Sequence, residues 1–315
     1  MRISHWLLSV ILCCLTLNAL AQKKIPFRFA TRAEAQMLIT DIDNFTNKLN
    51  SFDINLRLGK EDGRKSELLR LAMNETQNWS EEDKNKITAA FKSLQTKIDK
   101  QKLKIKYPQE VILVKTSMKE EMNVAAYTRK NWIALGEKYI NEATNDELEY
   151  LLAHEIFHLL TRSNKDFKKS VYSVIGFNVT ERELFFPIDI IEKRISNPDI
   201  ELYDSYAEFT INGNKQKCSM IIYTKIPFSP DKNLSDYLSV GLIPLNENLI
   251  PIQNDGKTVI YDINQAEDFY DKIGKNTQYI INPEEILADN FAYLLIQKKG
   301  LPNPEIQKKI AELLK

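Results

Sequence analysis

The chain has 315 residues, and its 43 Lys and Arg balance its 43 Asp and Glu, so the formal net charge is zero. A protein with this charge balance does not attract nucleic acid or anionic lipid over long range, so we expect neither as a partner. Hydrophobic residues make up 43% of the chain, enough for one large domain or two small ones.

Residues 1–21 have the features of a secretory signal peptide. Arg2 precedes a mostly apolar stretch over 7–20, and Ala19-Leu20-Ala21 fits a small-x-small cleavage site. The stretch is shorter than a membrane-spanning helix needs. We therefore predict a secreted or periplasmic protein, cleaved near Ala21, with no stable membrane insertion.

Cleavage would leave Cys218 as the single cysteine, so no intramolecular disulfide is expected. Cys13 and Cys14 raise the alternative of a lipid anchor. However, Leu12 stands where a lipoprotein signal has a small residue. The fold must then rely on its core, and on a metal if one is bound.

The region 22–105 is expected to form a helical N-terminal layer. Amphipathic patterns cover 31–50, about 61–77 and 81–102. Ser80, followed by three acidic residues, is typical of a helix start. No residue pattern in this layer indicates a catalytic or metal-binding site.

A small sheet is predicted next, because β-branched and apolar residues replace the helical pattern. Its expected strands are 110–116, 124–128 and 132–135, with a tight turn over 129–131. An open edge at either of the last two strands could bind an extended peptide as an additional strand.

The next segment contains His154-Glu155-Ile156-Phe157-His158, an H-E-x-x-H motif. A capping box at 144–147 and apolar residues at helical spacing predict one buried helix over 146–162. Positions i and i+4 share a helix face, so both imidazoles can bind one metal ion. Glu155 can then reach a water on that metal. The alternative is a core helix whose histidines make ordinary hydrogen bonds.

The remaining chain is predicted to contain a β-rich insert and two C-terminal helices. A short helix is expected near 166–175, and the insert covers about 200–262, with a hairpin turn at Asn212-Gly213. Helices are expected over 283–299 and 304–314. The predicted class is α+β, with a metallohydrolase domain over 106–315.

Two histidines and a water leave a zinc site one protein ligand short, and the mature chain would have no third histidine. The ligand must be Glu, Asp or Cys218. Glu285 is the best candidate, because Asp289 lies four residues later on the same helix face. Glu284, one position round the helix, is expected to point away. The alternative is an acidic first turn that faces solvent and complements the helix dipole.

These motifs resemble those of the gluzincins, the thermolysin-like zinc metallopeptidases, in which a Glu-x-x-x-Asp helix follows H-E-x-x-H. The resemblance implies a zincin-like fold, Zn²⁺ as cofactor, Glu285 as third ligand, and Asp289 as hydrogen-bond acceptor for His154. The interval from His158 to Glu285 is far longer than the roughly twenty residues of thermolysin. Glu181 and Glu183 lie nearer that spacing and are rival ligands, although neither has Asp four residues later.

The chain also resembles a group of uncharacterised secreted bacterial metallopeptidases. The similar segments are 154–162, 175–177, 196–199 and 283–291. This resemblance supports Glu285 but implies no particular substrate.

We therefore expect a secreted zinc metallopeptidase that hydrolyses peptide bonds with a zinc-bound water activated by Glu155. Its partner would be a peptide or protein substrate. Two alternatives are a catalytically inactive secreted binding protein on the same scaffold and a zinc amidohydrolase acting on a non-protein amide. The intact Glu155 favours an enzyme, because an inactive descendant has no need of the base.

Without a third histidine, a tyrosine or arginine must stabilise the oxyanion or contact the substrate. Arg162, Tyr279 and Tyr206 are the leading candidates, and Tyr203 and Tyr223 are further ones. Strand packing is the simpler explanation for each tyrosine. A charge interaction at the helix C-terminus explains Arg162 equally well.

Overall fold

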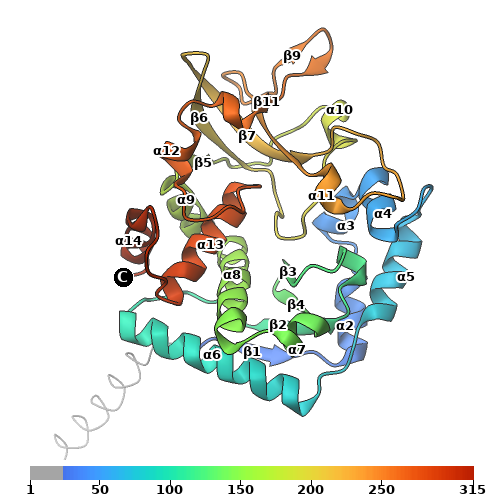
Figure 1. Cartoon of the computed structure of the whole chain (residues 1–315), viewed down its shortest axis with the longest axis vertical. Helices are drawn as coiled ribbons and strands as arrows, with labels where there is room; N and C mark the ends of the chain where they lie inside the picture. The colour runs from blue at the N-terminus through green and yellow to red at the C-terminus, as the bar shows by residue number, and fades with distance from the viewer. Residues whose placement is uncertain (1–23) are drawn as a thin grey trace, which may run out of the picture.

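A computed structural model describes residues 24–315 (Figure 1). The signal peptide predicted for 1–21 therefore lies outside the described residues. The chain has a mixed α+β fold that contains a four-stranded, a five-stranded and a two-stranded sheet. No helix within residues 24–315 is long and apolar enough to cross a membrane.

The four-stranded sheet has the order β1-β2-β4-β3. Its strands are β1 (Phe27–Phe29), β2 (Val111–Thr116), β3 (Ala126–Arg129) and β4 (Trp132–Gly136). The first three in this order are parallel, and β3 is antiparallel at the edge. The three predicted strands and their turn are confirmed to within two residues. The three residues of β1, too few to show a pattern, were not predicted.

The N-terminal region contains five helices where three were predicted. They are α2 (Arg32–Ile39), α3 (Asn44–Lys48), α4 (Ser51–Leu58), α5 (Lys65–Glu75) and α6 (Glu81–Gln101). The single helix predicted over 31–50 is wrong. Asp43 and Asn50 instead act as N-caps, accepting hydrogen bonds from the amides of Thr46 and Asp53 and starting new helices. The predicted start of α6 at Ser80 is confirmed.

The helix that carries H-E-x-x-H lies at the centre of the molecule (Figure 1). This helix, α8 (Asn145–Ser163), follows the short α7 (Glu137–Glu142), and the predicted capping box between Thr144 and Glu147 is confirmed. It packs against α6 and against α13 (Pro283–Leu295) in the main hydrophobic core. The fold thus packs α6 and α13, which are far apart in the sequence, against the same helix, α8.

The five-stranded sheet is antiparallel, with the order β11-β8-β7-β6-β5. Its strands are β5 (Phe177–Val179), β6 (Ser205–Ile211), β7 (Asn214–Tyr223), β8 (Ser239–Pro244) and β11 (Tyr261–Asp262). It therefore begins before the predicted boundary at 200. The hairpin at Asn212-Gly213 is confirmed, and both residues have positive φ, at 49° and 73°.

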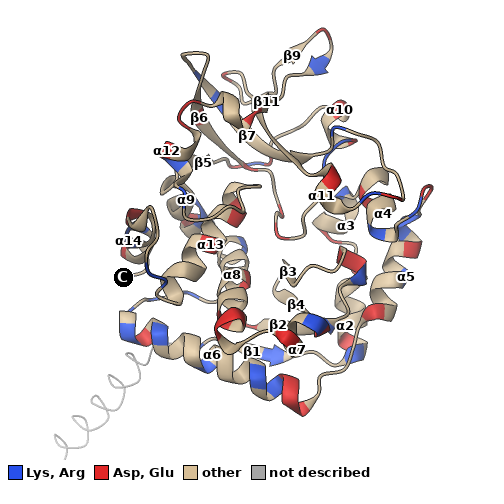
Figure 2. Ribbon diagram, in the orientation of Figure 1, with Lys and Arg blue, Asp and Glu red and all other residues tan. Residues whose placement is uncertain are grey.

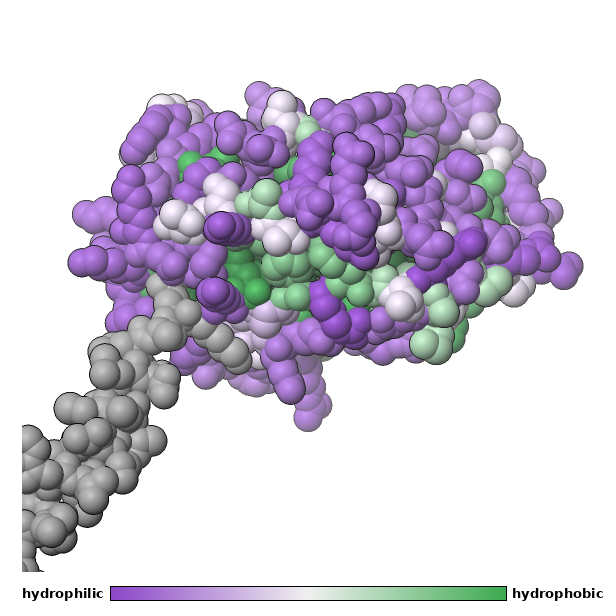
Figure 3. Space-filling model, turned by 90° about the horizontal axis from the view of Figure 1, so that it is seen from below, coloured by the Kyte–Doolittle hydropathy of each residue, from purple (hydrophilic) through white to green (hydrophobic). Residues whose placement is uncertain are grey.

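The other elements are short, apart from the final helix. They are η1 (Lys119–Glu121), α9 (Lys165–Ser173), α10 (Ile188–Ile191), α11 (Leu234–Tyr237), β9 (Gln253–Asn254), β10 (Lys257–Thr258), η2 (Ile263–Gln265), α12 (Phe269–Ile273) and α14 (Pro304–Leu313). Charges of both signs alternate along the outer helices such as α6 (Figure 2). The face of the molecule seen from below is mostly hydrophilic, with a smaller apolar band (Figure 3).

Every residue of α13 is buried, including its acidic ones. Glu284, Glu285 and Asp289 are 4%, 1% and 3% exposed. A buried acid requires a partner, because its desolvation is otherwise strongly unfavourable. The alternative of an acidic first turn that faces solvent is therefore excluded. The helix ends at Leu295, earlier than predicted, and Gln297 after it has a positive φ of 59°.

Candidate metal centre

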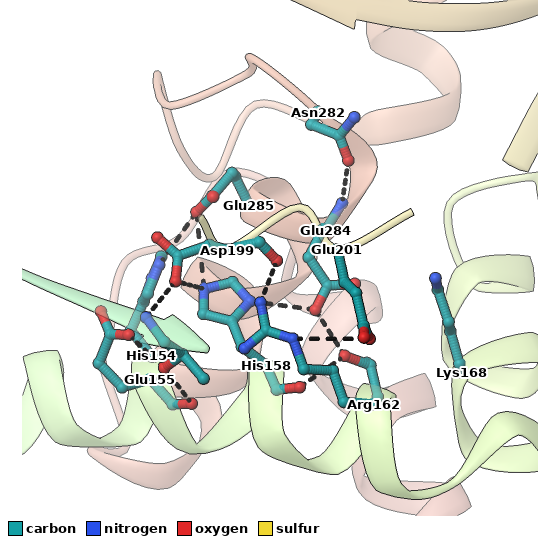
Figure 4. Close-up of polar contacts among 12 residues, drawn as sticks. His154, Glu155, His158, Arg162, Lys168, Asp199, Glu201, Asn282, Glu284 and Glu285 are labelled. Atoms are coloured by element: carbon teal, nitrogen blue, oxygen red, sulfur yellow. Dashed lines mark hydrogen bonds and ion pairs between the residues drawn. The ribbon is translucent and has the colours of Figure 1, made fainter. Parts of the chain in front are cut away.

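Three side chains from α8 and α13 direct ligand atoms at one point (Figure 4). The Nε2 atoms of His154 and His158 lie 3.1 and 3.7 Å from Oε2 of Glu285. The three residues form a group whose ligand atoms are all within 4.8 Å of one another. They are 8%, 0% and 1% exposed. The structure thus brings together the three ligands expected from the sequence.

The outer nitrogen of each imidazole contacts a carboxylate of α13. Nδ1 of His154 lies 2.9 Å from Oδ1 of Asp289, and Nδ1 of His158 lies 3.0 Å from Oε1 of Glu284. Such contacts fix the tautomer and direct Nε2 of each ring towards the shared point. Asp289 lies where it was expected.

The expectation that Glu284 points away from the site is wrong. Glu284 is buried beside His158 and also accepts hydrogen bonds from the hydroxyls of Thr161, at 2.6 Å, and Tyr172. His158 lies one turn further along α8 than His154, so its outer nitrogen meets the first turn of α13 rather than Asp289. No spacing rule in the sequence indicates this contact.

The residues present fit a zinc ion. Nε2 of His158 is buried and has no hydrogen-bond partner among the described atoms, which is unusual for a buried polar atom. Two imidazoles and one carboxylate, with a fourth position open, are the ligand set of many catalytic zinc sites. Cys218 is not part of this group. Burial raises the pKa of its thiol to about 12, so it stays protonated.

In the metal-free chain, the acidic surroundings favour protonated histidines. Burial alone would lower the pKa of His154, but its hydrogen bonds to Asp289 and Glu285 outweigh burial and raise that pKa well above its ordinary value. The pKa of His158 is also raised, against the effect of burial, by the charges of Asp199 and Glu285. A metal ion that binds here must therefore displace protons.

Glu155 lies beside the ligand group, next to the edge strand. Its Oε2 accepts a hydrogen bond of 2.6 Å from the hydroxyl of Thr128 in β3. Glu155 is 2% exposed and belongs to a second group of possible ligands with His158 and Asp199. The carboxylate is thus held next to the point on which the ligands converge, but it is not part of the first group.

Sequence reasoning missed two residues of the segment 196–199. Oδ1 of Asp199 lies 4.0 Å from Nε2 of His158 and accepts a hydrogen bond of 2.6 Å from the amide of Thr128. Nδ2 of Asn197 donates to Oε1 of Glu285 at 2.7 Å. Burial and the charge of Glu155 raise the pKa of Asp199 well above its ordinary value. In the sequence, the one indication that this region belongs to the site is that its Ser-Asn-Pro-Asp segment resembles the secreted bacterial metallopeptidases.

The rival ligands lie elsewhere. Glu181 is exposed and pairs with Lys165 and Lys169, and Glu183 pairs with Lys48 at 2.7 Å. Neither belongs to a possible metal group among residues 24–315. Although Glu181 and Glu183 are near His158 in the sequence, the fold does not place them beside the histidines.

Among the tyrosines predicted to contact the substrate, only Tyr279 has its ring beside the metal-ligand group. It is 44% exposed, and its ring centroid lies 6.4 Å from that of His154. Nη2 of Arg162 donates to the carbonyls of Pro198 and Asp199, both at 2.8 Å, so it anchors the segment 196–199. Tyr206 lies on β6 and packs against a separate core cluster, where strand packing accounts for it.

The same holds for the two further tyrosine candidates. Tyr203 and Tyr223 are both buried in that separate cluster. Packing within that cluster accounts for both positions.

No protein-family model, curated protein or solved structure matches the chain. Function must therefore be inferred from the chemistry of the site itself.

Proposed function

We propose that the chain is a secreted, zinc-dependent peptidase with a zincin-like arrangement of the gluzincin type. The observation that carries this proposal is the convergence of His154, His158 and Glu285 beside Glu155. The first three supply two imidazoles and a carboxylate, and the fourth is a carboxylate close to His158. The long interval between His158 and Glu285 contains the five-stranded sheet, which explains the departure from thermolysin-like spacing.

A zinc ion held by these ligands would supply Lewis acidity, both to a water molecule and to the scissile carbonyl. Glu155 takes the proton of the attacking water and passes it to the leaving amine. The hydroxyl of Thr128 holds its Oε2 in place for this transfer. Tyr279, which is half-exposed beside His154, is the best-placed donor for the developing oxyanion. Asp289 and Glu284 hold the two imidazoles in the tautomer that ligation requires.

The direct test measures metal content and turnover in the same preparation. We expect one zinc per chain, hydrolysis of members of a broad peptide library, and loss of hydrolysis with o-phenanthroline. Glu155→Gln should retain zinc and lose turnover. Asp146→Asn, an exposed change in the first turn of the same helix, should alter neither. A chain without zinc would overturn the proposal. Zinc without peptide hydrolysis would favour the binding protein, and cleavage of non-peptide amides alone would favour the amidohydrolase.

A further inference from the structure

The open edge of the four-stranded sheet is partly occupied by the chain itself. β3 is the outermost strand, and the amide of Thr128 points away from β4 and donates to Oδ1 of Asp199 at 2.6 Å. Alternate residues of a strand present their amide and carbonyl to the same side. Ala126 therefore faces this edge too, whereas Val124 before it is 36% exposed but its amide already donates to the carbonyl of Glu121 at 3.2 Å. An extended peptide could pair with this part of the edge.

Beyond Thr128 the edge is closed. β3 ends at Arg129, whose guanidinium donates to Asp43 at 2.8 Å and to the carbonyls of Ile39 and Asp41 at 3.0 and 2.9 Å. The connection between α2 and α3 is thereby fixed against the end of the strand. A peptide paired with β3 can therefore extend from Thr128 only towards Val124, and one of its ends must lie beside Asp199.

The segment 196–199 is a fixed wall of the site rather than a removable lid. Arg57 donates to the carbonyl of Ser196 at 2.7 Å, and the carboxylate of Asp53 accepts from the amide and hydroxyl of Ser196 at 2.8 and 2.7 Å. Asp53 and Arg57 are 0% and 4% exposed. Releasing the segment would remove these hydrogen bonds from buried charged groups, which is unfavourable even though Arg57 keeps its ion pair with Glu121 at 2.8 Å and Asp53 keeps the amide of Asn50. The contacts of Asn197 with Glu285 and of Arg162 with the segment's carbonyls fix its other side.

The charge at this closed end selects which peptide terminus can lie there. Asp199 and Glu155 have carboxylate oxygens within 4.8 Å of each other. A peptide's C-terminal carboxylate would add a third acid to this pair, whereas an α-ammonium group would donate hydrogen bonds to the acid oxygens and offset their charge. With its N-terminus at Thr128 and its chain extending towards Val124, the peptide would run antiparallel to β3.

We propose that Asp199 is a specificity-determining residue that binds the α-ammonium group of a peptide substrate, so that hydrolysis is confined to bonds close to a free N-terminus. This inference rests on the peptidase function proposed above. The substrate class is that of an aminopeptidase, because the fixed segment leaves no path for the chain to continue past Thr128.

The test compares one cleavable peptide in three forms: with both termini free, N-acetylated, and C-amidated. N-acetylation should lower kcat/KM by about 10–100-fold or more, because it removes the charge that pairs with Asp199. C-amidation should have little effect. Asp199→Asn keeps an oxygen for the amide of Thr128, so the fold should persist. It should raise KM for the free peptide with a smaller change in kcat, and leave the acetylated peptide unaffected. Glu192→Gln, at an exposed acid that ends α10, is the matched control.

A binding measurement provides a readout that does not depend on turnover. By calorimetry, zinc-loaded Glu155→Gln should bind the free-amine peptide at least tenfold more tightly than the acetylated one, and the additional Asp199→Asn change should remove the difference. Equal cleavage of free and acetylated peptides would overturn the inference while leaving the peptidase intact. Faster cleavage of both forms by Asp199→Asn would show instead that the segment blocks the site. Absence of any peptide hydrolysis would overturn both proposals.

Discussion

Replacement of Glu284 by alanine probes a contact that the sequence did not predict. The carboxylate of Glu284 accepts from Nδ1 of His158 at 3.0 Å, from the hydroxyl of Thr161 at 2.6 Å and from the hydroxyl of Tyr172. Thr161 has a second acceptor, the carbonyl of His158 at 3.1 Å. The substitution therefore leaves two buried donors, on His158 and Tyr172, without a partner.

Each buried donor without a partner costs about 1–3 kcal/mol, so Glu284→Ala should lower the free energy of unfolding by about 2–6 kcal/mol. The ring of His158 also loses the group that orients it, which should weaken zinc binding about 10–100-fold. Glu284→Gln keeps an oxygen for His158 and Thr161, and the hydroxyl of Tyr172 can turn to accept from its amide. That variant should lose less than about 1.5 kcal/mol.

Urea unfolding of the metal-free protein measures the first quantity, and competition with a chromogenic chelator at fixed pH measures the second. Glu305→Ala, at an exposed acid in the first turn of α14, is the control and should stay within about 0.5 kcal/mol of the parent. The reasoning is refuted if Glu284→Ala unfolds within about 1 kcal/mol of the parent and binds zinc within about twofold of it.

Four further predictions concern the same chain. Glu155→Gln should keep zinc and lose about 10²–10⁴-fold in kcat, measured by metal analysis and steady-state rates; comparable turnover would exclude it as the base. Glu285→Ala should weaken zinc binding more than Asp289→Ala, for which about 10–100-fold is expected, and equal losses in a chelator competition would contradict the ligand assignment. Removal of zinc with EDTA should lower Tm, and an unchanged calorimetric melting curve after confirmed metal loss would show that the site does not stabilise the fold. Burial raises the pKa of Glu120 from 4.5 to about 7, so the folded state retains a proton that the unfolded chain releases. Stability should therefore fall by about 2–4 kcal/mol as the pH rises from 4.5 to 7, and Glu120→Gln should flatten that dependence in urea titrations.

Elements whose signals are local can be predicted from the residue pattern. The capping box and the apolar periodicity of α8 lie within one stretch of chain, as do the proline and the i, i+4 acids of α13, so the residue pattern alone predicts both helices. The same holds for the hairpin at Asn212-Gly213, because a turn depends on the φ angles of its own residues. The spacing of His154 and His158 likewise indicates a shared face.

Which distant groups meet those histidines depends instead on how whole elements pack against one another. The rotation and offset of α13 along α8 place Glu285 at the inner nitrogens and Glu284 at the outer nitrogen of His158. The segment that carries Asp199 belongs to no regular element, so no periodicity indicates it. It reaches the site because buried partners on α4 and α8 hold it there. Contacts of this kind arise from the packing of whole elements against one another, and a local sequence pattern carries no information about that packing.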